Sequence, residues 1–145
     1  MGQHVLVVDD DPKMLALVEL ALEEGGFQTV TAETALDGIK ELRREEPDAV
    51  LLDLGLPDMH GRQLLERFRN DHPHIPVVVL TASDDVDEVV ACMRLGASDF
   101  VKKPFDRTRP VTSVGNAVTQ GKLRSRVETL SGELKERQGL SLIHI

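Results

Sequence analysis

The sequence lacks the features that mark secreted and membrane proteins. Its 145 residues include a single cysteine, Cys92, so no disulfide can form within the chain, and a reducing cytoplasm is the expected compartment. No apolar run approaches the ~20 residues that a membrane-spanning helix needs. No signal-peptide pattern of positive charge, long apolar stretch and small residues precedes the first apolar segment. These absences predict a soluble, cytoplasmic protein with no membrane contact.

Basic residues are also scarce. The chain has 17 Lys and Arg against 25 Asp and Glu, which gives a net charge of -8 at pH 7. Such a chain has no broad attraction for nucleic acid or anionic lipid, so we expect no direct binding to either. A divalent cation is a more natural partner. The length and the 41% of hydrophobic residues suit one domain with its own core, followed by an appendage.

Short apolar runs alternate along the chain with amphipathic helical patterns. The apolar runs predict strands over 5–8, 27–31, 49–52, 77–80 and 99–101. The helical patterns lie over 14–22, 35–42, 64–68 and 86–93, and a last helix is expected to start near Thr108, with Pro110 in its first turn. Alternating strands and helices are typical of a parallel sheet covered on both faces. The sequence therefore predicts a three-layer α/β/α sandwich.

Polar side chains follow four of the five predicted strands. They are Asp9, Asp10 and Asp11 after the first strand, Asp53 after the third, Thr81 after the fourth and Lys103 after the fifth. In such sheets the functional crevice lies at the carboxyl ends of the strands, so these side chains are expected to meet there. Clustered carboxylates repel one another and lose solvation, but a hard cation such as Mg²⁺ prefers oxygen ligands. The cluster therefore predicts a metal site.

Other polar residues are expected to have ordinary roles. Asp11 precedes Pro12 and is expected to cap the helix that begins there. Asp58, Asp84 and Asp85 are expected in solvated loops, and His72 and His74 at the surface, since the sequence offers no third metal ligand near these two histidines.

The ordered set "VVDDD", "LLDLGLPDMHG", "LTA" and "KKPF" resembles the receiver domain of bacterial two-component response regulators, over roughly residues 3 to 118. The resemblance implies a flavodoxin-like doubly wound fold with strand order 2-1-3-4-5. It also implies the roles of individual residues. Asp53 would be the phosphoacceptor, Asp9, Asp10, Asp53 and the carbonyl of Gly55 would hold Mg²⁺ or Mn²⁺, Thr81 and Lys103 would contact the phosphoryl oxygens, and Thr81 and Phe100 would form the switch.

By the same resemblance, the donor would be the phosphohistidine of a sensor histidine kinase or phosphotransfer protein. The protein would not be an enzyme in its own right, but a phosphoacceptor that assists its own phosphorylation and dephosphorylation. Phosphorylation would change the face formed by the fourth helix, fifth strand and fifth helix, and so control an output domain or partner. Phe100 stands where a tyrosine is frequent in the family, so the switch ring has no hydroxyl to hydrogen-bond.

Three segments are expected along the chain: a receiver domain over 1–121, a helical linker toward a missing output domain over 122–139, and a non-native, adapter-derived tail over 140–145. The linker carries a short apolar seam formed by Leu123, Val127, Leu130 and Leu134. Such a seam is too short to pair alone, so it predicts a homodimer that depends on phosphorylation. The alternative is an amphipathic extension that packs on its own domain.

Three other functions remain open at this point. A pseudo-receiver that has lost phosphotransfer is disfavoured by the intact set of polar residues at the strand ends. A flavin or nucleotide binder would need a phosphate-binding loop after the first strand, where three aspartates would repel phosphate. An aspartyl-nucleophile hydrolase would resemble a family with a second carboxylate two residues after the nucleophile, and "DLGLPD" has Gly55 there.

Overall fold

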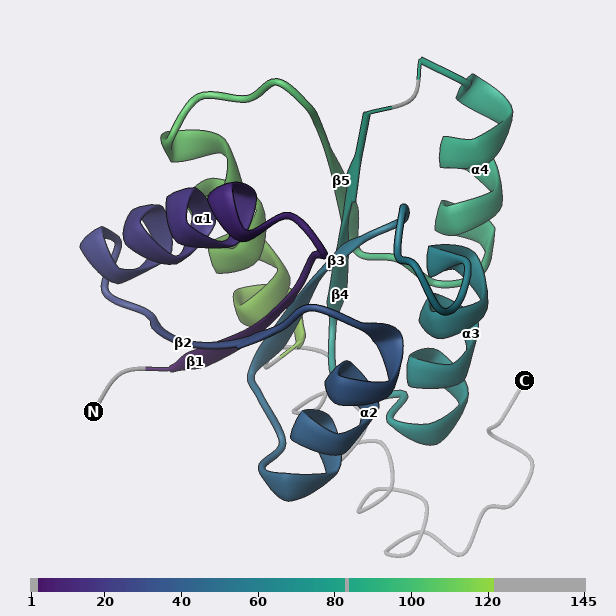
Figure 1. Cartoon of the computed structure of the whole chain (residues 1–145), viewed down its shortest axis with the longest axis horizontal. Coiled ribbons are helices and arrows are strands. Elements are labelled where there is room, and N and C mark those ends of the chain that lie inside the picture. The colour runs from purple at the N-terminus through teal and green to yellow at the C-terminus, as the bar shows by residue number, and fades with distance from the viewer. Residues whose placement is uncertain (1–2, 83, 122–145) are drawn as a thin grey trace, which may run out of the picture.

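The computed structural model describes residues 3–82 and 84–121 (Figure 1). Five strands form one parallel sheet in the order β2-β1-β3-β4-β5. Their bounds are β1 His4–Val8, β2 Gln28–Ala32, β3 Ala49–Asp53, β4 Val77–Thr81 and β5 Asp99–Lys102. The flavodoxin-like doubly wound fold with strand order 2-1-3-4-5 is therefore confirmed. Each predicted strand differs from the observed one by only one residue at either end.

Four helices have bounds α1 Pro12–Glu24, α2 Ala35–Arg44, α3 Gly61–Asp71 and α4 Val86–Arg94. A fifth helical segment spans 108–121, so the predicted start near Thr108 is confirmed. The predicted linker over 122–139 and tail over 140–145 lie outside the described residues. Within the described part of the chain, no helix combines the length and the apolar composition needed to cross a membrane.

The helices cover both faces of the sheet and form two separate cores. Figure 1 shows α1 and the green 108–121 segment on one face, and α2, α3 and α4 on the other. Successive strand residues point to opposite faces, so Val5 and Val7 of β1 belong to the first core, and Leu6 and Val8 belong to the second. All five residues of β3 and of β4 are buried, which explains why these strands read as continuous apolar runs.

Side chains cap the N-termini of the helices. Asp11 accepts a hydrogen bond from the Lys13 N–H at 3.0 Å, and Pro12 is the first residue of α1, so the predicted cap is confirmed. Asp58 is exposed as expected, but its carboxylate also accepts hydrogen bonds from the N–H groups of Ala35 and Leu36 at the start of α2. The loop after β3 is therefore attached to α2.

Candidate functional site

Three carboxylates meet at the carboxyl end of the sheet. Asp53 is the last residue of β3, and Asp9 follows β1, which pairs directly with β3. One carboxylate oxygen from each of Asp9, Asp10 and Asp53 can be chosen so that all three atoms lie within 4.8 Å of one another. Asp9 and Asp53 are buried, whereas Asp10 is exposed. The topology thus brings together residues that are far apart in the sequence.

An ammonium group balances part of this negative charge. Lys103 Nζ lies 3.2 Å from Asp53 Oδ1 and 3.3 Å from Asp9 Oδ2. The neighbouring Lys102 points elsewhere and forms an ion pair with the exposed Asp84. The backbone N–H of Lys103 donates to the carbonyl of Thr81 at 2.7 Å, which fixes the lysine beside the end of β4.

The site carries more negative than positive charge. Burial is the largest influence on the Asp9 carboxyl and raises its pKa, and the charge of Asp53 adds to this effect, while the Asp11 N–H and Lys103 oppose it. Burial disfavours the charged form of Lys103, but its attraction to Asp53 and Asp9 outweighs that effect, so its pKa is raised. One ammonium paired with Asp9 and Asp53, beside the third carboxylate of Asp10, leaves net negative charge that another cation would offset.

The site fits a hard divalent cation such as Mg²⁺. Its donors are all carboxylate oxygens, which such ions prefer, and they come from two adjacent strand ends. Asp11 does not join them, because its side chain caps α1 while its N–H donates to Asp9 Oδ1 at 3.0 Å. The backbone at Gly55 runs close to the acidic cluster, since a Cβ placed there would lie 3.8 Å from Asp53 Oδ2.

A hollow of about 390 Å³ opens above Asp53. Its walls include Thr81, the last residue of β4, and the small residues Gly55 and Ala82. Lys103 also lines it. A phosphoryl group placed against Asp53 would therefore lie beside a hydroxyl and an ammonium group, with no bulky side chain at Gly55 or Ala82 to block its approach.

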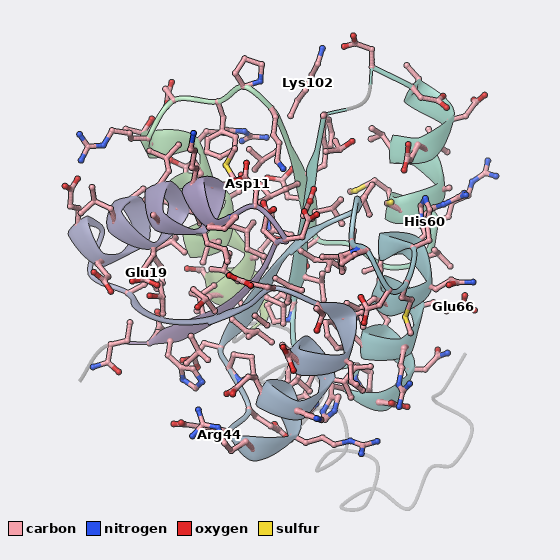
Figure 2. The ribbon with its side chains drawn as sticks, in the orientation of Figure 1. Asp11, Glu19, Arg44, His60, Glu66 and Lys102 are labelled. Carbon is pink, nitrogen blue, oxygen red and sulfur yellow. The ribbon has the colours of Figure 1, made fainter. Side chains whose placement is uncertain are left out.

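Two further residues line the hollow and are not among the site residues predicted from the sequence. They are His60, which precedes α3, and Glu88, which comes from α4. Figure 2 labels His60 close to the start of α3 and beside α4. The predicted helical pattern begins only at Leu64, so the sequence leaves His60 in the preceding loop, and no local pattern places Glu88 near Asp53.

Phe100 lies apart from the acidic cluster. It is a residue of β5, half-buried, and packs against the core beneath α2, α3 and α4. Its carbonyl accepts a hydrogen bond from Arg109 Nη2 at 3.0 Å, which connects β5 to the 108–121 segment. Phe100 therefore lies on the α4 side of the sheet, in the strand whose surface the switch is expected to change.

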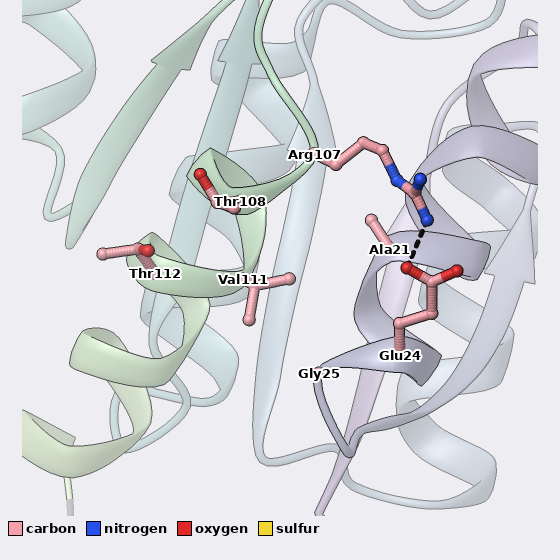
Figure 3. A pocket seen from close by; sticks show the side chains of 7 residues that line it. All are labelled: Ala21, Glu24, Gly25, Arg107, Thr108, Val111 and Thr112. Atoms are coloured by element: carbon pink, nitrogen blue, oxygen red, sulfur yellow. Dashed lines mark hydrogen bonds and ion pairs between the residues drawn. The ribbon is translucent and has the colours of Figure 1, made fainter.

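A larger hollow of about 560 Å³ lies away from the acidic cluster (Figure 3). It separates the end of α1 from the 108–121 segment, and an ion pair between Arg107 and Glu24 crosses it. None of the predicted site residues lines it. Size alone therefore does not identify the functional site of this fold.

The family model described as "Response regulator receiver domain" matches residues 5–114. The chain belongs to the response regulator receiver family. Among its relatives, the probable transcriptional regulatory protein TcrX of Mycobacterium tuberculosis is 43% identical over 101 residues, which cover 70% of this chain and 43% of TcrX. The nitrogen assimilation regulatory protein NtrX of Azorhizobium caulinodans is 33% identical over 132 residues, which cover 90% of this chain and 29% of NtrX.

Solved structures of the family agree with the fold. The crystal structure of NtrX from Brucella abortus in complex with ADP matches with a TM-score of 0.85 and 32% identity, over 90% of this chain and 30% of that chain. A CheY-like receiver domain protein from Methanospirillum hungatei matches with a TM-score of 0.81 and 25% identity, over 86% of this chain and 99% of that chain. The receiver thus spans less than half of the curated relatives named above. It is a regulatory domain of two-component signalling.

Proposed function

We propose that this receiver accepts a phosphoryl group on Asp53 from the phosphohistidine of a sensor histidine kinase or phosphotransfer protein. The observation that carries the proposal is the position of Lys103 Nζ, 3.2 Å from Asp53 Oδ1, at the edge of an open hollow that Thr81 also lines. A carboxylate that attacks an anionic phosphoryl group needs positive charge close by. Lys103 supplies one such charge.

In the proposed transfer, an Asp53 carboxylate oxygen attacks the phosphorus atom. A new O–P bond forms and the P–N bond of the donor breaks, so the electron pair of that bond goes to the imidazole nitrogen of the donor. Lys103 and the Thr81 hydroxyl bind phosphoryl oxygens. Asp9, Asp10, Asp53 and the Gly55 carbonyl would hold Mg²⁺ or Mn²⁺, and the bound cation would neutralise charge on the carboxylates and the phosphoryl group.

The same residues would assist the loss of the phosphoryl group. A water molecule that attacks phosphorus breaks the O–P bond and leaves the Asp53 carboxylate and inorganic phosphate. Gly55 and Ala82 leave the hollow open to such a water molecule, because neither carries a large side chain. The receiver would then both accept the phosphoryl group and limit how long it stays bound, without turning over a separate substrate.

The proposed output is a change in the face formed by α4, β5 and the 108–121 segment. Thr81 would move toward the phosphoryl group and Phe100 would rotate into the space that it leaves, with a coupling of about 1–3 kcal/mol. Relatives are named transcriptional regulators, which supports control of a transcriptional output or partner. Dimerisation through the 122–138 seam is part of the proposal, although that segment lies outside the described residues.

Mass spectrometry of the full chain after incubation with Mg²⁺ and acetyl phosphate tests the proposal. One phosphoryl group should appear on the peptide that contains Asp53, and both Asp53→Asn and a chelator should abolish it. Asp58→Asn is the matched control, because Asp58 lies in the same loop but bonds to α2. Undiminished labelling of the Asp53→Asn variant would disprove the assignment.

A further inference from the structure

Helix α4 is held to the rest of the domain by few apolar contacts. Only Cys92 of α4 is buried, whereas α1, α2 and α3 each bury four residues. Val86, Val90 and Met93 of α4 are exposed by 71%, 40% and 41%. Little apolar burial means that local opening of α4 costs little free energy, so its polar contacts have a large share in its position.

One of these polar contacts lies at the hollow above Asp53. His60 Nε2 is 3.9 Å from Glu88 Oε1, and both residues line the hollow. His60 Nδ1 accepts a hydrogen bond from the Arg62 N–H at 3.1 Å and thereby caps α3. With Nδ1 as an acceptor, Nε2 is the nitrogen that carries a hydrogen and faces Glu88, and its N–H attracts the carboxylate electrostatically across 3.9 Å, a separation longer than a hydrogen bond. The pair therefore connects the start of α3 with the first turn of α4.

We propose that the His60–Glu88 pair holds α4 beside the hollow in the unphosphorylated receiver, and that a phosphoryl group on Asp53 breaks this contact. This inference rests on the proposed function. A phosphoryl group in the hollow carries negative charge and repels the Glu88 carboxylate. It also offers His60 Nε2–H a more highly charged acceptor. His60 would exchange partners, and α4 would lose one of its few attachments to the loop that follows Asp53.

His60 and Glu88 are thus positioning residues that couple the phosphoryl site to α4. Neither needs to take part in the bond changes at phosphorus. Without phosphorylation the His60 imidazole contacts the Glu88 carboxylate on α4, and after phosphorylation it contacts a phosphoryl oxygen. The difference in free energy between these two contacts is their contribution to the coupling. A ligand changes a conformational equilibrium only through such a difference in interaction.

Three variants separate this contact from its surroundings. His60→Asn removes the imidazole but keeps a side chain that is well suited to cap α3. Glu88→Gln removes the charge on the α4 side. Asp87→Asn is the matched control, since Asp87 also lies in the acidic first turn of α4 but does not line the hollow. Loss of favourable charge at the helix N-terminus is therefore the same in Glu88→Gln and Asp87→Asn.

Hydrogen exchange of the full chain without a phosphodonor tests the contact. Exchange of α4 amides should be faster by about two- to five-fold in His60→Asn and Glu88→Gln than in Asp87→Asn, the range expected for one weak, partly exposed electrostatic contact. The double variant should resemble the single ones, because both remove one interaction. Exchange of α3 amides should stay unchanged. Equal α4 exchange in Glu88→Gln and Asp87→Asn would overturn the proposal.

Beryllofluoride with Mg²⁺, which imitates the phosphorylated state, tests the exchange of partners. On binding, α4 exchange in the wild type should rise to the level of Glu88→Gln, so the difference between them should disappear. Fluorine NMR reports the binding of beryllofluoride independently. Absence of a bound signal would contradict the proposed function, whereas a bound signal with a persistent difference between wild type and Glu88→Gln would overturn the partner exchange alone.

Discussion

Lys103 Nζ lies 3.2 Å from Asp53 Oδ1 although the two residues are 50 positions apart in the chain. Strand β4 lies between β3, which ends at Asp53, and β5, which precedes Lys103. The lysine therefore reaches across the end of the intervening strand, where Thr81 is located. This geometry brings the ammonium, the hydroxyl and the carboxylate to one edge, and it makes the lysine both a structural counter-charge and the proposed ligand of a phosphoryl group.

Lys103→Met should destabilise the domain by about 2 kcal/mol at neutral pH without Mg²⁺, because Asp53 and Asp9 would lose their shared cation. Saturating Mg²⁺ should restore part of the loss. Lys102→Met is the control and should change stability little, since Lys102 pairs with an exposed carboxylate. Urea unfolding with and without Mg²⁺ measures both effects. Equal losses in the two variants would show that Asp53 and Asp9 do not depend on Lys103.

Asp10→Asn should weaken Mg²⁺ binding by about ten-fold or more, since one anionic ligand is lost. Stability of the metal-free domain should be unchanged or slightly higher, because Asp10 is exposed and its removal relieves repulsion with the other two carboxylates. Mg²⁺ titration and thermal melting measure these two quantities separately. An unchanged Mg²⁺ affinity would exclude Asp10 as a ligand.

The sequence predicts the acidic cluster well because parallel strands place their carboxyl ends at one edge. Once the strand order is known, Asp9 and Asp53 must be neighbours. The alternation of apolar runs with helical patterns predicts the parallel sheet, and the family resemblance supplies the strand order. The contacts of Asp58 with α2 could not be predicted in this way, because they depend on the path of the loop after β3. The proximity of Glu88 to His60 could not be predicted for a similar reason, since their distance depends on how α4 lies on the sheet.

The pKa of Asp58 gives a prediction for acidic pH. Its hydrogen bond from the Ala35 N–H, together with that from Leu36, lowers its pKa below the ordinary value of 3.8. The ionised carboxylate therefore stabilises the fold above that value, and the stabilisation is lost as the pH falls through the lowered pKa. Asp58→Ala should be less stable than the wild type at pH 7, and the difference should shrink in acid.

Asp58→Asn provides the control for that experiment. It keeps an acceptor oxygen but cannot titrate, so its difference from Asp58→Ala should not change with pH. Urea unfolding at a series of pH values measures the three proteins side by side. A difference between wild type and Asp58→Ala that stays constant into strong acid would contradict a role for the ionised carboxylate.

Two glycines provide a test of how tightly the loop after Asp53 is packed. A Cβ at Gly61 would lie 2.3 Å from Leu54 Cα, so Gly61→Ala requires the backbone to move and should cost about 3 kcal/mol. A Cβ at Gly115, in the 108–121 segment, meets nothing within 4 Å, so Gly115→Ala should stabilise by about 0.5–1 kcal/mol through its higher helix propensity. Since Leu54 follows Asp53 directly, Gly61→Ala should also lower Mg²⁺ affinity, whereas Gly115→Ala should not. Chemical unfolding and Mg²⁺ titration of both variants measure these effects, and equal stability of the two would show that the loop yields without cost.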